Sequence, residues 1–127
     1  MTALLDASAL LALINEEPGA DQVEKVLADA AISTVNAAEV ASKLNEFDWS
    51  PDEIAPLFHH LQLDILPFDL DTALASGQLR SVTKKLGLSL GDRACIATGL
   101  STRYRILTAD KSWTQLKIRG VSIKCIR

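Results

Sequence analysis

The chain has 127 residues, of which 48% are hydrophobic and 23% charged, values typical of one globular domain rather than a disordered or fibrous protein. The longest apolar stretch near the N-terminus, residues 9–14, is far shorter than the ~20 residues of a membrane helix, and no basic, cleavable leader precedes it. The sequence therefore predicts a single domain over residues 1–127, located in the cytoplasm and without membrane contact.

The net charge of −3 is unevenly distributed along the chain. Residues 1–79 hold two basic and fourteen acidic residues, a net charge of −12, whereas residues 80–127 hold eleven basic and two acidic residues, a net charge of +9. The basic portion fits a polyanionic ligand or a solvated face that attracts the acidic portion. Its two acidic residues are Asp92 and Asp110. Two distant cysteines, Cys95 and Cys125, predict free thiols rather than a disulfide or a zinc site.

In the first half of the chain, strand and helix signals alternate. A short buried strand ends at residues 4–5, and a helix follows over residues 7–15 up to the break at Pro18-Gly19. Helical spacing recurs over residues 23–30, a second strand covers 31–35, and a helix with a buried stripe covers 37–44. The stretch Ser50-Pro51-Asp52-Glu53 predicts the start of another helix with a capping box, ending near residue 61.

The second half continues the alternation. A third strand is predicted over residues 63–68, followed by a longer helix whose apolar stripe is Ala75, Leu79, Val82 and Leu86 and which ends at Gly87. Residues 92–100 predict a helix, 105–108 a fourth strand, 111–116 a short helix and 121–126 a fifth strand. Strands joined by helices indicate the α/β class, with a mostly parallel five-stranded sheet covered on both faces.

Acidic side chains stand at points where such a sheet binds its ligands, beyond the carboxyl ends of its strands. Asp6 ends the first strand and Asp110 follows the fourth, so the two carboxylates converge if these strands flank the point where the strand order reverses. Thr108 would share a face with Asp110. Glu39 and Asp92 would approach from neighbouring helices.

Each acidic residue also has a purely structural interpretation. Asp6, Asp92 and Asp110 all occupy expected helix N-caps, where aspartate commonly accepts main-chain hydrogen bonds. Glu39 could simply pair with Lys43 one helical turn away. On this interpretation the chain is a non-catalytic α/β protein-interaction module. A phosphoacceptor signalling domain fits less well, because the first strand ends in one aspartate rather than an acidic pair.

Four motifs, in order and with suitable spacing, resemble the PIN-domain nuclease family, and in particular its VapC-type toxins of toxin–antitoxin pairs. They are Leu4-Leu5-Asp6-Ala7-Ser8-Ala9-Leu10, Ala38-Glu39-Val40-Ala41, Leu88-Ser89-Leu90-Gly91-Asp92-Arg93-Ala94-Cys95 and Leu107-Thr108-Ala109-Asp110-Lys111-Ser112-Trp113. The resemblance places the family's acidic positions at Asp6, Glu39, Asp92 and Asp110, and polar positions near its site at Ser8 and Thr108. It implies a PIN-like three-layer α/β/α sandwich, an endoribonuclease activity, a cognate antitoxin and a homodimer.

The residue types also predict the chemistry of the site. A carboxylate cluster without thiolate or convergent imidazole ligands suits Mg²⁺ or Mn²⁺, and such an ion can activate a water for phosphodiester hydrolysis. The basic residues predicted to contact RNA phosphates are Arg80, Lys84, Arg93 and Lys111. Solvated surface is the alternative for each of them.

Overall fold

A computed structural model describes residues 2–127, and its centre is a five-stranded sheet in which every strand pairing is parallel. The strands are β1 (Ala3–Leu5), β2 (Ala30–Ser33), β3 (Asp64–Leu66), β4 (Arg105–Thr108) and β5 (Ile123–Cys125). Their order is β3-β2-β1-β4-β5, so β1 and β4 are neighbours and the strand order reverses between them. The predicted switch point is therefore confirmed.

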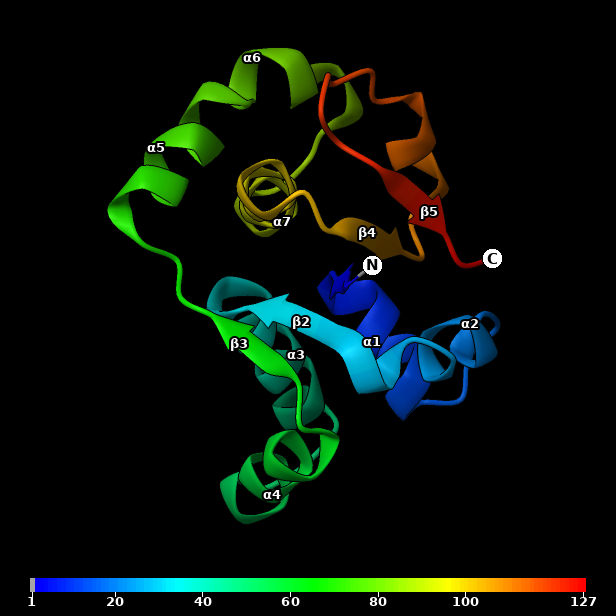
Figure 1. The fold of residues 1–127 in the computed structure, drawn as a ribbon. Coiled ribbons are helices and arrows are strands. Elements are labelled where there is room, and N and C mark those ends of the chain that lie inside the picture. Colours follow the sequence, from blue (N-terminus) through cyan, green and yellow to red (C-terminus); the bar gives the residue numbers. More distant parts are fainter. Residues whose placement is uncertain (1) are drawn as a thin grey trace.

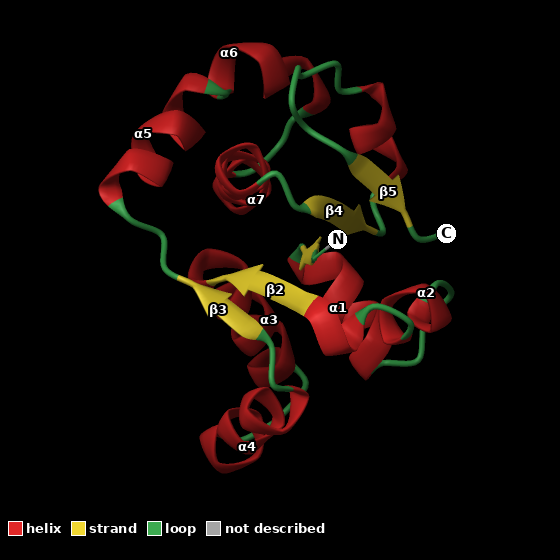
Figure 2. Ribbon diagram, viewed as in Figure 1, coloured by secondary structure: helices red, strands yellow, loops and turns green. Residues whose placement is uncertain are grey.

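Helices cover both faces of this sheet, as Figures 1 and 2 show. The α-helices are α1 (Ala7–Ile14), α2 (Ala20–Glu24), α3 (Thr34–Glu46), α4 (Pro51–Leu61), α5 (Leu70–Gln78), α6 (Arg80–Thr83) and α7 (Leu90–Thr102). Three short 3₁₀ helices complete the set, namely η1 (Leu27–Asp29), η2 (Lys84–Leu86) and η3 (Lys111–Gln115). In residues 2–127, no helix is long and apolar enough to cross a membrane.

Two hydrophobic cores form because neighbouring residues of a strand point to opposite faces of the sheet. Leu5 packs with α1 and α3 on one face, whereas Leu4 packs with α7 and Trp113 on the other. Helix α7 lies close to the sheet at Gly99, where an added Cβ would lie 2.6 Å from Cδ1 of Ile106. This double-sided burial confirms the α/β/α sandwich and explains why the central strand β1 consists of apolar residues alone.

The predicted long helix before Gly87 is wrong in two respects. It is divided into α5, α6 and η2, and Val82 is 61% exposed instead of buried. The buried side chains on this segment are Ser76, Leu79 and Thr83. Thr83 can be buried because its hydroxyl donates a 2.8 Å hydrogen bond to the carbonyl oxygen of Leu79, one turn earlier.

Several predicted boundaries also move. The helical spacing over residues 23–30 becomes α2, η1 and the start of β2, and the strands β3 and β5 are shorter than predicted. Strand β2 ends at Ser33 because the hydroxyl of Ser33 caps α3 by accepting from the Val35 amide. Helix α4 begins at Pro51 with the predicted capping box of Ser50 and Glu53.

Candidate metal-binding and catalytic site

Four acidic side chains from different elements line one cleft at the carboxyl edge of the sheet. Asp6 follows β1, Asp110 follows β4, Glu39 lies on α3 and Asp92 on the first turn of α7. The cleft has a volume of about 430 Å³ and is also lined by Ser8, Leu11, Ser42, Lys43 and Glu46 among others. All four acidic residues that the sequence predicts therefore line the same cleft.

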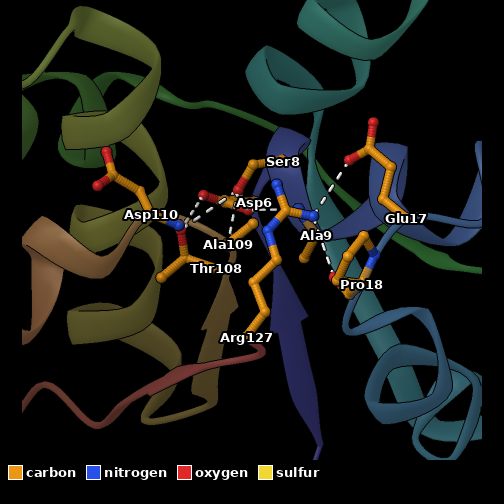
Figure 3. Close-up of polar contacts among 9 residues, drawn as sticks. All are labelled: Asp6, Ser8, Ala9, Glu17, Pro18, Thr108, Ala109, Asp110 and Arg127. Carbon is orange, nitrogen blue, oxygen red and sulfur yellow. Dashed lines mark hydrogen bonds and ion pairs between the residues drawn. The ribbon is translucent and has the colours of Figure 1, made fainter.

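Asp6 is the most buried of the four, with 5% of its surface exposed. Its Oδ1 accepts hydrogen bonds from the Ala9 amide at 2.8 Å and the Ser8 hydroxyl at 2.7 Å, and its Oδ2 accepts from the Thr108 hydroxyl at 2.6 Å (Figure 3). Burial raises the pKa of Asp6 from 3.8 to about 6, although these hydrogen bonds oppose the shift and the charge of Asp92 adds a little to it. A cation in the cleft would favour the ionised form of this carboxyl.

Ser8 and Thr108 connect Asp6 to the turn that carries Asp110. The Ser8 hydroxyl accepts from the Ala109 amide at 2.9 Å, and the Thr108 hydroxyl accepts from the Asp110 amide at 3.1 Å. Both hydroxyls donate to Asp6, so the same two side chains join the ends of β1 and β4. These hydrogen bonds fix the orientation of the Asp6 carboxylate relative to the turn after β4.

Asp110 also caps η3, because its Oδ1 accepts from the amide and the hydroxyl of Ser112 at 2.9 and 2.7 Å. Figure 3 shows its main-chain nitrogen toward Thr108 and its carboxylate turned away from Asp6. The predicted N-cap roles of Asp6 and Asp110 are therefore confirmed. Capping does not compete with a site role here, since each of these carboxylates also lines the cleft.

For Asp92 the predicted N-cap position is wrong. Helix α7 begins earlier than predicted, with Ser89 as its N-cap, and Asp92 is the third helical residue. Its Oδ2 accepts from the Ser89 amide at 2.9 Å, while its own amide donates to the Ser89 hydroxyl at 3.2 Å. This capping box fixes the first turn of α7 and with it the direction of the Asp92 side chain into the cleft.

Glu39 is held by Asn36, a residue outside the four sequence motifs. Asn36 Nδ2 donates to Glu39 Oε1 at 2.6 Å and to the carbonyl oxygen of Gly91 at 3.1 Å. Burial raises the pKa of Glu39, the bond from Asn36 opposes this shift, and the charge of Asp92 adds to it. A signal for Asn36 does exist in the sequence: it shares the buried face of α3 with Val40 and Leu44, where an amide is unusual.

Lys43 does not pair with Glu39 as the structural alternative supposed. Its ammonium lies 3.5 Å from a carboxylate oxygen of Glu46, and both side chains are more than half exposed. Lys43 also lines the cleft, a position that its spacing from Glu39 does not predict. An exposed pair of this kind contributes little to stability, so the Lys43 ammonium is available to a ligand.

The predicted RNA-contacting residues lie outside this cleft. Arg80 on α6 and Lys84 on η2 are exposed, and Lys111 is exposed next to Asp110. Arg93 on α7 is half-buried and donates from Nη1 to the carbonyl oxygen of Ser76 at 3.3 Å, which ties α7 to α5. None of the four is among the residues that line the acidic cleft.

The carboxylate oxygens of the cleft are suitable ligands for a hard divalent cation, although the four side chains are not arranged around one point. Cys95, the one thiol near these acids, is fully buried, and burial together with the charges of Asp6, Asp92 and Glu39 raises its pKa. It therefore stays protonated and is a poor ligand. Across residues 2–127, no three acidic, imidazole or thiol side chains are grouped closely enough to chelate one ion as they stand. Binding would require side chains of the cleft to rotate, with water completing the coordination.

The fold and the cleft together define an α/β protein with a carboxylate site at the carboxyl edge of a parallel sheet. The family model for the PIN domain matches residues 3–118. The chain belongs to the PIN domain family, as its four motifs predict. PIN domains are generally nucleases, so family membership supports a hydrolase activity.

Solved structures agree with this assignment. VapBC2 of Rickettsia felis, solved bound to a DNA fragment from its promoter, is 18% identical with a TM-score of 0.77 over 98% of each chain. A toxin–antitoxin complex from Klebsiella pneumoniae is 25% identical with a TM-score of 0.71 over 94% of this chain and 95% of that one. FitAcB of Neisseria gonorrhoeae is 21% identical with a TM-score of 0.69 over 98% of each chain. A search of curated protein sequences finds no match. The resemblance to VapC-type toxins is confirmed.

Proposed function

We propose that the protein is a Mg²⁺- or Mn²⁺-dependent endoribonuclease and the toxin of a toxin–antitoxin pair. The observation that carries this proposal is the convergence of Asp6, Glu39, Asp92 and Asp110 on one cleft, with the pKa of the buried Asp6 raised to about 6. Burying a carboxylate among like charges is costly unless a cation compensates it. A non-catalytic module that used these residues only as helix caps would not need them to share a cleft.

Asp6, Glu39, Asp92 and Asp110 would hold the metal. When bound, the ion would neutralise charge at the scissile phosphate and lower the pKa of a water, so that the water could give up a proton and attack the phosphorus as hydroxide. Asp6 is fixed for this role by the hydroxyls of Ser8 and Thr108. Within residues 2–127 Glu39 is held by a hydrogen bond at Oε1 and not at Oε2, so its Oε2 can bind the ion or accept the proton of the attacking water.

The decisive test is incubation with total cellular RNA in the presence of Mg²⁺ or Mn²⁺, followed by mapping of the cut ends. We expect discrete cuts that cease when a chelator is added and resume when excess Mn²⁺ is restored. Intact RNA at every metal concentration, with the protein folded throughout, would exclude the ribonuclease and favour the interaction module.

The partners belong to the same proposal. The structure from Klebsiella pneumoniae, which shares this fold, is a toxin–antitoxin complex. By this analogy we propose that a cognate antitoxin binds this chain and that the toxin forms a homodimer. A cytoplasmic location follows from the proposed substrate, since cellular RNA is found there.

The basic residues provide a second, separable prediction about RNA binding. Each phosphate contact made by lysine or arginine contributes a slope of ~0.7 to the fall of log affinity with log salt for a single strand. Reversing Arg80 and Lys84 together to glutamate should lower this slope by ~1.4 if both contact phosphates. Fluorescence anisotropy with single-stranded RNA in a chelator, which prevents cleavage, measures the slope at several salt concentrations.

Lys25→Glu is the control for this measurement, because Lys25 is exposed and lies in the acidic portion of the chain. It should leave the salt slope unchanged. An unchanged slope in the Arg80/Lys84 variant would remove this surface from the proposed RNA path. Lys43, Arg93 and Lys111 would then be the next candidates, with Lys43 first since it lines the cleft.

A further inference from the structure

Asn36 connects two of the four acidic positions through one buried amide. It lies in the first turn of α3, is 1% exposed, and donates from Nδ2 both to Glu39 Oε1 at 2.6 Å and to the carbonyl oxygen of Gly91 at 3.1 Å. Gly91 directly precedes Asp92 on α7. The amide of Asn36 thus links the carboxylate of Glu39 to the main chain that carries Asp92.

The orientation of this amide follows from its partners. Both neighbours of Nδ2 are oxygens that can only accept, so the opposite orientation would place Asn36 Oδ1 against two acceptors. In the orientation that remains, Oδ1 is buried and has no partner within residues 2–127. An unpaired buried oxygen is unfavourable, and leucine would fill a similar space without one. A packing role alone therefore does not account for asparagine at this position.

Gly91 fixes the other side of the Glu39 carboxylate. A Cβ added at Gly91 would lie 2.5 Å from Glu39 Cδ and 2.7 Å from Oε2, so the carboxylate occupies the space that a side chain would take. The residues described, 2–127, contain no hydrogen-bond donor to Oε2. Glu39 is thereby held at Oε1 by Asn36, and its carboxylate packs against Gly91 of α7. Its Oε2 has no hydrogen-bond donor among these residues.

We propose that Asn36 is a positioning residue that fixes Glu39 against α7, with Gly91 as the close-contact position that makes room for it. Asn36 Nδ2 donates hydrogen bonds to both Glu39 Oε1 and the Gly91 carbonyl oxygen, and in this way it sets the separation between Glu39 and Asp92. This proposal rests on the proposed function, because it assigns Glu39 Oε2 to the metal or to the attacking water.

The first test measures Mn²⁺ binding to the full chain by calorimetry, without RNA and therefore independently of cleavage. Asn36→Leu keeps the packing volume and removes the donors, and Asn36→Asp keeps the shape but faces Glu39 with an acceptor. Both should weaken Mn²⁺ binding by ~10–100-fold, the usual effect of losing a partner that orients a metal ligand. Asn45→Leu, an exposed asparagine on the same helix, is the control and should bind as the wild type does. If Asn36→Leu does not fold, the isosteric aspartate variant decides the outcome.

A double-mutant cycle with Glu39→Gln separates positioning from a general structural effect. If Asn36 acts through Glu39, Asn36→Leu should change Mn²⁺ affinity far less in the Glu39→Gln background than in the wild type. Gly91→Ala should resemble the Asn36 variants, because the new methyl group displaces the same carboxylate. Additive effects, or wild-type Mn²⁺ affinity in both Asn36 variants, would overturn the inference.

The cycle also distinguishes failure of the inference from failure of the proposed function. If Glu39→Gln reduces Mn²⁺ affinity and RNA cleavage while both Asn36 variants behave as the wild type, only the role of Asn36 is wrong. If Glu39→Gln itself leaves Mn²⁺ affinity and cleavage unchanged, the assignment of Glu39 to the site is wrong and the role of Asn36 falls with it.

Discussion

Replacing Asp6 with asparagine should reduce RNA cleavage by more than ~100-fold while the protein stays folded. Loss of a residue that merely orients a metal ligand typically costs ~10–100-fold, and the proposed role of Asp6 is direct. Asparagine keeps an oxygen that can accept from the Ala9 amide and the Ser8 hydroxyl, so the start of α1 should remain capped. Timed cleavage of total RNA with Mn²⁺, beside a near-ultraviolet circular dichroism spectrum, measures both properties.

Asp69→Asn provides a matched control for this prediction. Asp69 is also an N-cap aspartate, accepting from the Thr72 amide at 2.9 Å at the start of α5, but it does not line the cleft. Its replacement should leave cleavage unchanged. Cleavage at the wild-type rate by folded Asp6→Asn protein would show that Asp6 is a helix cap and nothing more.

Much of the site could be predicted because strand ends in a parallel sheet have a defined geometry. The apolar run that ends at Asp6 and the run before Thr108 identify β1 and β4, and helical crossovers make these strands parallel. The carboxyl ends of neighbouring parallel strands lie at one edge, so Asp6 and Asp110 had to be close once β1 and β4 were neighbours. The neighbourhood of β1 and β4 itself could not be deduced from periodicity.

Other features depended on contacts that a sequence pattern does not contain. The burial of Thr83 in place of Val82 depends on a hydrogen bond to the preceding turn, which hydrophobic spacing ignores. The role of Asn36 depends on the approach of α3 to Gly91, fifty-five residues later in the chain. By contrast, the true start of α7 was within reach, because Ser89 and Asp92 have the spacing of a capping box.

The stability of the metal-free protein should fall as the pH rises from about 4 to about 7 in the part contributed by Asp6. Burial raises the pKa of Asp6 in the folded protein to about 6, against 3.8 for an exposed aspartate. In this interval the folded state binds more protons than the unfolded state, so the free energy of unfolding decreases with pH. A shift of this size lowers the free energy of unfolding by at most about 3 kcal/mol. This loss of stability is absent below the lower pKa and complete above the higher one.

Urea unfolding of the wild type and of Asp6→Asn, in a chelator at a series of pH values, isolates this contribution as the difference between the two proteins. Relative to the wild type, Asp6→Asn should become progressively more stable as the pH rises through this window. Asp69→Asn should show no trend in this window and the opposite trend below about pH 4, because hydrogen bonds from Thr72 lower the pKa of the exposed Asp69 below 3.8 and its contribution is lost as the pH falls through that range. Adding Mn²⁺ at pH 7 should stabilise the wild type more than Asp6→Asn, since the cation binds the ionised cluster of the folded state. Parallel pH profiles for the wild type and Asp6→Asn, with equal stabilisation by Mn²⁺, would mean that the Asp6 carboxyl experiences neither the burial nor the metal assigned to it.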